Sequence, residues 1–84
     1  MSYSIEFSQE AASDIDFISI ADRRLFVRII NKVESLQESP RAGKPLVGNH
    51  KGEFSLRVGS YRIVYEIAGH TIYILTIKHC RHVY

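Results

Sequence analysis

The sequence predicts an α+β fold in which two N-terminal helices pack on a small, mainly antiparallel sheet. Three observations lead to this prediction. Two amphipathic helical patterns fill the first half of the chain, three strand patterns joined by tight turns fill the second half, and a short alternating segment precedes the helices. The expected order is therefore β-α-α-β-β-β, within a single domain that spans residues 1–84.

The first expected elements are a strand and a helix. In Ser2–Phe7 apolar side chains alternate with polar ones, which is the period of a strand. Ser8 is a suitable helix N-cap, and Glu10 places negative charge in the first helical turn. A helix over Gln9–Ile20 follows, because its apolar residues recur at helical spacing, at Ala11, Ile15 and Ile18.

A second helix is expected over Asp22–Gln37. Its apolar stripe consists of Phe26, Ile29, Ile30, Val33 and Leu36. Its other face carries Arg23, Arg24, Arg28, Lys32 and Glu34. Ser39-Pro40 ends the helix, because the residue before a proline avoids helical backbone. Residues 39–52 hold both prolines and three of the five glycines, so we expect a loop there.

The second half of the chain is expected to form an antiparallel meander. Its three strands cover Glu53–Val58, Tyr61–Ile67 and Thr71–Lys78. Gly59-Ser60 and Ala68-Gly69-His70 supply the turns between them. Since the helices should cover the apolar face of these strands, Arg57 and Arg62 are expected as neighbours on the opposite face.

Charge is unevenly divided along this chain of formal net charge +2. Residues 1–40 hold four basic against seven acidic residues, whereas residues 41–84 hold seven basic against two acidic residues and all four histidines. A basic half-domain favours a polyanionic partner such as nucleic acid. An ordinary solvated face produces the same imbalance, so both interpretations stay open.

The composition argues against several classes of protein. The chain has no run of 18 apolar residues, its N-terminus lacks the signal-peptide pattern, and its single cysteine excludes an internal disulfide. We therefore expect a cytoplasmic protein. No Walker loop, dinucleotide fingerprint or zincin helix occurs, and His79, Cys80 and His82 are too few for a zinc site, so no metal or cofactor is expected.

The end of the predicted sheet gathers residue types suited to RNA cleavage. The planar guanidinium groups of Arg57 and Arg62 match phosphate oxygens, unless they only solvate the sheet. His79 and His82 can carry protons near neutral pH, or simply face solvent. Tyr84 can stack on a base or pack back as a hydrophobic plug. Attack by a 2′-hydroxyl needs a base, an acid and charge stabilisation, which such side chains supply without a metal.

The segment Leu56–Tyr65 (LRVGSYRIVY), with the later His79-x-Arg81-x-Val83-Tyr84 ending, resembles the RelE/ParE toxin superfamily, most closely its RelE-type branch. The resemblance covers the whole chain. It implies the toxin of a type II toxin–antitoxin system, a ribosome-dependent endoribonuclease that cleaves mRNA in the A site by 2′-hydroxyl attack and so inhibits translation. A gyrase poison of the ParE type, or a degenerate homologue that only binds its antitoxin, stays open.

The resemblance also implies partners. They are a cognate RelB-like antitoxin, acidic and partly disordered, together with mRNA and the 70S ribosome. The toxin–antitoxin complex is expected to bind its own operator DNA.

The family pattern also transfers roles to residues of this chain. Arg62 matches the arginine that stabilises phosphate, and Tyr84 matches the C-terminal tyrosine that stacks on the substrate. Two lysines of RelE proper, one a candidate base, correspond to Glu53 and Ser55 here. The expected catalytic set is Arg62, His79, Arg81, Tyr84, His82 and Glu53. His79 ranks above His82 as the expected acid, because it ends a strand and matches the family's histidine position. The expected phosphate-binding set is Arg57, Lys44, Lys51 and Lys78, with Lys44, His50 or Lys51 as further sources of a base.

Overall fold

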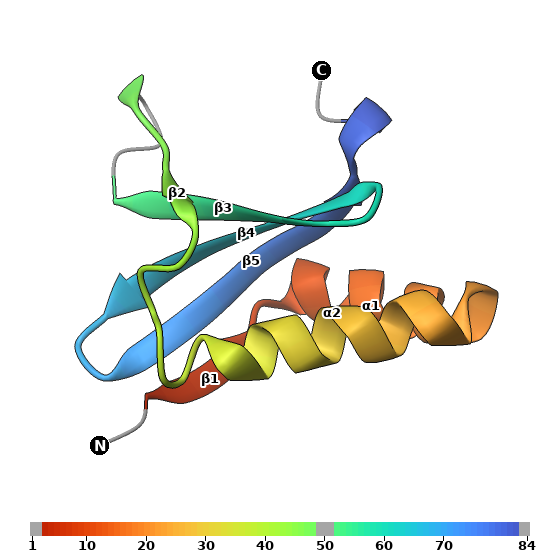
Figure 1. Ribbon diagram of the computed structural model, residues 1–84, viewed down its shortest axis with the longest axis horizontal. Coiled ribbons are helices and arrows are strands. Elements are labelled where there is room, and N and C mark those ends of the chain that lie inside the picture. Colours follow the sequence, from red (N-terminus) through yellow and green to blue (C-terminus); the bar gives the residue numbers. More distant parts are fainter. Residues whose placement is uncertain (1–2, 49–51, 83–84) are drawn as a thin grey trace.

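The computed structural model describes residues 3–48 and 52–82, which form a five-stranded sheet covered on one side by two helices (Figure 1). The elements are β1 (Ser4–Phe7), α1 (Gln9–Ala21), α2 (Arg23–Ser35), β2 (Lys44–Pro45), β3 (Glu53–Val58), β4 (Tyr61–Ala68), β5 (Thr71–His79) and a 3₁₀ turn (Cys80–His82). The strands lie in the order β1-β5-β4-β3-β2, with β1 parallel to β5 and every other pair antiparallel. The predicted α+β fold is confirmed.

The two helices follow one another almost directly, because a single aspartate serves both. Asp22 caps the end of α1 through its backbone N–H, and its Oδ1 accepts a hydrogen bond from Leu25 N–H of α2 at 3.1 Å. The predicted cap at Ser8 is also present, since its Oγ accepts from Ala11 N–H at 2.9 Å. Both helices lie side by side beneath the sheet (Figure 1).

One segment departs from the prediction. The expected loop over residues 39–52 contains β2, whose Lys44 pairs with Ser55 and whose Pro45 pairs with Phe54 of β3. A two-residue strand has no periodicity to detect, and proline is usually a sign against strand pairing because it lacks an N–H donor. Residues 49–51 of this segment lie outside the described residues.

The helices bury one face of the sheet, here called the covered face, and the other is called the open face. The core between helices and sheet is apolar, and its most buried side chains are Ala11, Ile18, Ile29, Val33, Leu36, Ile63, Tyr65, Ile72, Ile74 and Ile77. Most come from the stripes that the helical and strand periods predicted. Burial of this apolar area is the main favourable contribution to folding.

A bulge in β5 decides which side chains reach which face. Two consecutive β4 residues pair with β5 residues that are two apart, Val64 with Thr76 and Tyr65 with Ile74. Leu75 is the extra residue, and the alternation of β5 changes phase there, as bulges impose. Ile74 and Ile77 are therefore both buried although they are an odd number of positions apart. Lys78 consequently lies on the open face and His79 on the covered face.

Where β1 ends, the start of α1 takes over the hydrogen bonds to the backbone groups at the edge of β5. Ser8 N–H donates to Ile74 O at 2.9 Å, and Ser8 Oγ donates to Leu75 O at 2.7 Å. Six residues later Asp14 Oδ2 accepts from Ile77 N–H at 3.0 Å. Helix α1 thus replaces a neighbouring strand along this stretch, which protects an otherwise open edge.

Candidate functional site

Three basic residues lie in one row across the open face, and we call them the basic row: Arg57, Arg62 and Lys78. Arg57 of β3 is directly opposite Arg62 of β4, and Arg62 is directly opposite Lys78 of β5. Directly paired residues share a face, with Cβ atoms about 4.5–5.5 Å apart. The structure confirms the predicted neighbourhood of the two arginines and adds Lys78 to it.

Lys78 is the member of the basic row that an internal network holds. Its Nζ donates to Asp14 Oδ1 at 2.7 Å and lies 3.1 Å from Glu10 Oε2, both on α1. The hydrogen bond to Asp14, and then that to Glu10, raises the pKa of Lys78. The charge of Lys78 is therefore partly compensated, and the positive potential of the row centres on Arg57 and Arg62.

Two further predicted site residues, Lys44 and Glu53, lie on the open face. Lys44 is paired with Ser55 of β3. Ser55 is two positions from Arg57, which corresponds to roughly 7 Å along that strand. Glu53 is four positions from Arg57, about 13 Å along the strand, and is paired with Glu66. The lysine is thus close to the arginine pair, whereas the carboxylate lies at the other end of β3.

His79 lies at the same end of the sheet as Arg62 but on the covered face. It is paired with Tyr61, and the two rings meet edge to face, with centroids 5.3 Å apart and planes at 74°. His79 Nδ1 accepts a hydrogen bond from Arg81 N–H at 3.1 Å, so the neutral imidazole carries its proton on Nε2. Strict alternation along β5 predicts the open face for His79, and the bulge at Leu75 reverses it.

The remaining predicted site residues belong to the tail and the loop. The 3₁₀ turn is fixed to the β3–β4 hairpin by Cys80 N–H, which donates to Ser60 O at 2.7 Å, and Arg81 is exposed there. The chain therefore leaves the sheet beside the strand that carries Arg62. Tyr84, His50 and Lys51 fall outside the described residues, as does the side chain of His82.

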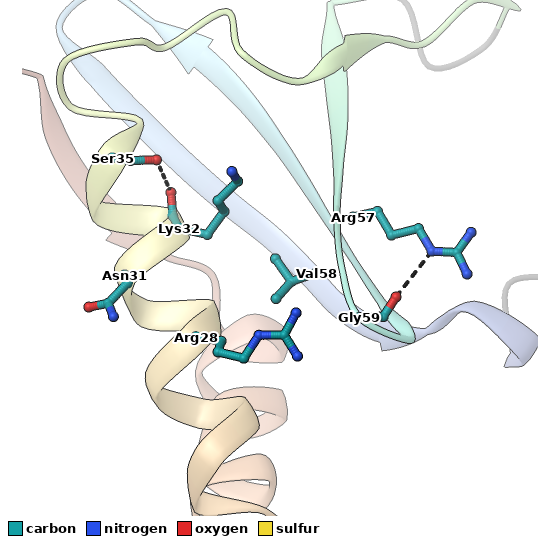
Figure 2. Close-up of a pocket in the computed structure, with 7 residues that line it drawn as sticks. All are labelled: Arg28, Asn31, Lys32, Ser35, Arg57, Val58 and Gly59. Atoms are coloured by element: carbon teal, nitrogen blue, oxygen red, sulfur yellow. Dashed lines mark hydrogen bonds between the residues drawn. The ribbon is translucent and has the colours of Figure 1, made fainter.

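Sequence reasoning missed a groove between α2 and the β3–β4 hairpin, here called the α2 groove (Figure 2). Its volume is about 400 Å³, and it is lined by Arg28, Asn31, Lys32, Ser35, Arg57, Val58 and Gly59. Two of its cations come from the half of the chain with excess negative charge, which concealed them. The detectable signal was the spacing of Arg24, Arg28 and Lys32, four residues apart on one helix face.

Within residues 3–48 and 52–82, no group of three or more His, Cys, Asp or Glu side chains is arranged to hold a metal ion. In the same residues no helix has both the length and the apolar character needed to cross a membrane.

Comparison with known proteins places this geometry in a family. Residues 5–84 match the family model described as the ParE toxin of the type II toxin–antitoxin system parDE. A chain of the toxin–antitoxin complex RelBE2 from Mycobacterium tuberculosis is 30% identical, with a TM-score of 0.82 over 94% of this chain and 99% of that one. No curated protein sequence matches at a significant level. The chain therefore belongs to the RelE/ParE superfamily of toxins from type II toxin–antitoxin systems.

More distant structures share the fold. The YoeB dimer from Staphylococcus aureus is 24% identical, with a TM-score of 0.81 over 94% of this chain and 98% of that one. A chromosomal ParDE system from Pseudomonas aeruginosa is 19% identical, with a TM-score of 0.72 over 93% and 96% of the two chains. The two-layer architecture is thus common to toxins named YoeB, RelE and ParE.

Proposed function

We propose that this toxin is an endoribonuclease that cuts mRNA in the ribosomal A site by attack of a 2′-hydroxyl on the adjacent phosphate. The observation that carries the proposal is the pairing of Arg57 with Arg62 on the open face. Two guanidinium groups at this spacing suit a phosphate, and they stay charged at any working pH. Arg62, on a central strand, is the residue proposed to stabilise the charge that develops on the phosphorane.

The acid is proposed to come from the tail, and the base that takes the 2′-hydroxyl proton is proposed to be Lys44, which is paired with Ser55 on the open face. By strand register, no carboxylate or imidazole of the described strands is paired with Arg62 on the open face. His79 faces the helices, and Glu53 is about 13 Å along β3 from Arg57. We therefore assign the acid that protonates the leaving 5′-oxygen to His82, ahead of His79, and substrate stacking to Tyr84. Such an incomplete set would need the ribosome to position the RNA.

An acidic, partly disordered antitoxin is the proposed protein partner. The similar chain in the Mycobacterium tuberculosis complex is bound in a toxin–antitoxin assembly. This chain exposes Phe17 and Ile20 of α1, with 67% and 87% of each residue accessible, and carries basic residues on the open face. An antitoxin segment that folds on binding could cover both kinds of surface. The complex is further proposed to bind operator DNA.

Induction of the toxin without its antitoxin tests the proposal. We expect growth arrest with new 5′ ends inside translated mRNA, mapped by primer extension, and poor cleavage of ribosome-free RNA by the purified protein. DNA supercoiling and double-strand breaks are measured in the same cultures. Gyrase-dependent breaks with intact transcripts would contradict the nuclease function.

A ParE-type gyrase poison is the second candidate. Two observations favour it. The matching family model is that of a ParE toxin, and in the described strands no carboxylate or imidazole is paired with Arg62. Under this function the basic row would contact DNA or gyrase, and the tail histidines would be dispensable.

A further inference from the structure

The α2 groove joins two separate elements of the fold into one basic surface. Helix α2 contributes Arg28 and Lys32, one helical turn apart, and β3 contributes Arg57 from the other side (Figure 2). Among the described residues that line the groove, none is acidic. Like charges at positions i and i+4 of a helix repel one another, so a bound anion would relieve repulsion that the groove contains.

Arg28 and Arg57 approach the hairpin turn from its two sides (Figure 2). Arg57 Nε donates to Gly59 O at 3.1 Å, which fixes the guanidinium beside the turn. On the other side of the turn, a methyl group on Gly59 would lie 3.5 Å from Arg28 Nη1. Gly59 adopts the left-handed region with a φ of 57°, which glycine tolerates without strain. The tight turn thus lets Arg28 approach the backbone next to Arg57.

The lining chemistry selects phosphate over an acidic peptide. An amphipathic peptide helix needs an apolar groove for its anchor residues. Among the described residues that line the groove, Val58 is the one with an apolar side chain, and it is 6% accessible. The other side chains can donate hydrogen bonds, although Ser35 Oγ already donates to Lys32 O at 2.6 Å. Guanidinium and ammonium groups are typical of contacts to a nucleic-acid backbone.

We propose that the α2 groove is a second phosphate-binding site, which holds the RNA backbone beyond the phosphate bound at the basic row. Arg57 belongs to both surfaces, because it is paired with Arg62 on the open face and also lines the groove. An RNA strand bound at Arg62 can therefore continue past Arg57, over the outer edge of β3, towards Arg28 and Lys32. The identity of the ligand as RNA rests on the proposed function.

The test measures salt-dependent binding of a labelled twelve-nucleotide 2′-O-methyl RNA, which lacks the attacking hydroxyl and cannot be cleaved. The variant Arg28→Gln/Lys32→Gln is compared with Arg23→Gln/Arg41→Gln, which removes the same charge at exposed positions outside the groove. Each lost phosphate contact lowers the slope of log K against log salt by about 0.7 for single strands. We expect the groove variant to lose about 1.4 in slope and the control to lose little.

Two further arms define the alternatives. The charge-conserving variant Arg28→Lys/Lys32→Arg should restore the slope, and thermal melts should agree among all variants because the substituted residues are exposed. An equal loss of slope in the control pair would show that the effect depends on net charge alone, and it would contradict the proposed binding site. Binding of a twelve-residue polyglutamate peptide that needs Arg28 and Lys32, with RNA binding unchanged, would overturn it in favour of an acidic peptide.

The outcome is separable from that of the proposed function. The groove variant could lose slope while mRNA stays intact in induced cells. That result would support RNA binding by the groove and contradict the proposed nuclease activity. Cleavage of mRNA by the wild type with an unchanged slope in the groove variant would reject the groove alone.

Discussion

The two faces of the sheet have opposite tasks although their residues alternate along the same strands. On β4, Ile63 is fully buried against the helices, whereas its neighbour Arg62 lies on the open face between Arg57 and Lys78. One face supplies stability and the other is proposed to supply chemistry. Substitutions at adjacent positions should therefore separate the two properties, because alternation places neighbouring side chains in different surroundings.

The two faces also differ in how strictly they limit the residue types that they can carry. The covered face must remain apolar to bury area, whereas the open face can carry any residue that water or a ligand accommodates. The bulge in β5 changes which side chains belong to each face, because it places Lys78 on the open face and His79 on the covered one. A single extra residue thus changes which side chain can reach a bound phosphate.

The largest effect is expected from deleting residues 81–84. If the tail supplies the proton donor and the stacking residue, ribosomal cleavage should fall by about 10²–10⁴-fold, while antitoxin binding is largely kept. Primer extension and co-purification measure the two properties. Cleavage at the wild-type rate would show that the tail takes no part in the reaction.

The two histidines can be compared in the same assay. His82→Ala should reduce cleavage more than His79→Ala, and the reverse order would favour His79 as the acid.

Ile63→Ala tests the covered face. Because the side chain is fully buried, its truncation should lower the free energy of unfolding by about 2–5 kcal/mol, measured by urea denaturation. The cleavage rate per folded molecule should stay close to that of the wild type. A cleavage defect in a fully folded variant would mean that the two faces are not independent.

Tyr65→Phe tests a buried polar link beneath the covered face. The hydroxyl of Tyr65 donates to Pro40 O at 2.9 Å and accepts from Gly43 N–H at 2.9 Å. Removing it leaves the buried N–H unsatisfied, so we expect a loss of about 1–3 kcal/mol in unfolding free energy. The half-buried Tyr73→Phe serves as the control and should cost less. Equal losses would show that the two hydrogen bonds contribute nothing specific.

The smallest effect concerns alkaline pH. Asp14 and Glu10 raise the pKa of Lys78, and burial raises the pKa of Tyr65, from ordinary values of 10.5 and 10.0. Each group therefore stabilises the fold fully below its ordinary pKa, and this contribution is lost as the pH rises through the folded-state pKa.

Lys78→Met isolates the lysine contribution. It should cost less than about 1 kcal/mol at pH 8, since Lys78 is partly exposed, and the difference from the wild type should shrink at pH 11. A difference that grows with pH would contradict the assigned network.

Much of the fold could be predicted because it depends on local periodicity. The stripe from Ala11 to Ile18, the N-cap at Ser8 and the hairpin turn at Gly59-Ser60 are all present in the structure. The parallel pairing of β1 with β5 is a long-range contact and has no local signature. The two-residue strand β2 has none either.

The site was predictable where it depends on strand alternation and a tight hairpin, and not where it depends on a bulge or on helix packing. Arg57 and Arg62 were placed correctly because a tight hairpin fixes their pairing. The position of His79 was not accessible, because the bulge at Leu75 leaves no mark in the sequence. The α2 groove was missed because Arg28 and Arg57 become neighbours only when α2 packs beside the hairpin.

The most direct test of the central claim is the cleavage rate of Arg62→Ala on translating ribosomes, with a thermal melt of the same preparation. The open face should lose one charge that stabilises the transition state, so we expect cleavage to fall by about 10²–10³-fold with an unchanged melting temperature. The exposed Arg41→Ala, outside the basic row, should keep both properties. Wild-type cleavage by Arg62→Ala, or its unfolding, would contradict the division of labour between the two faces.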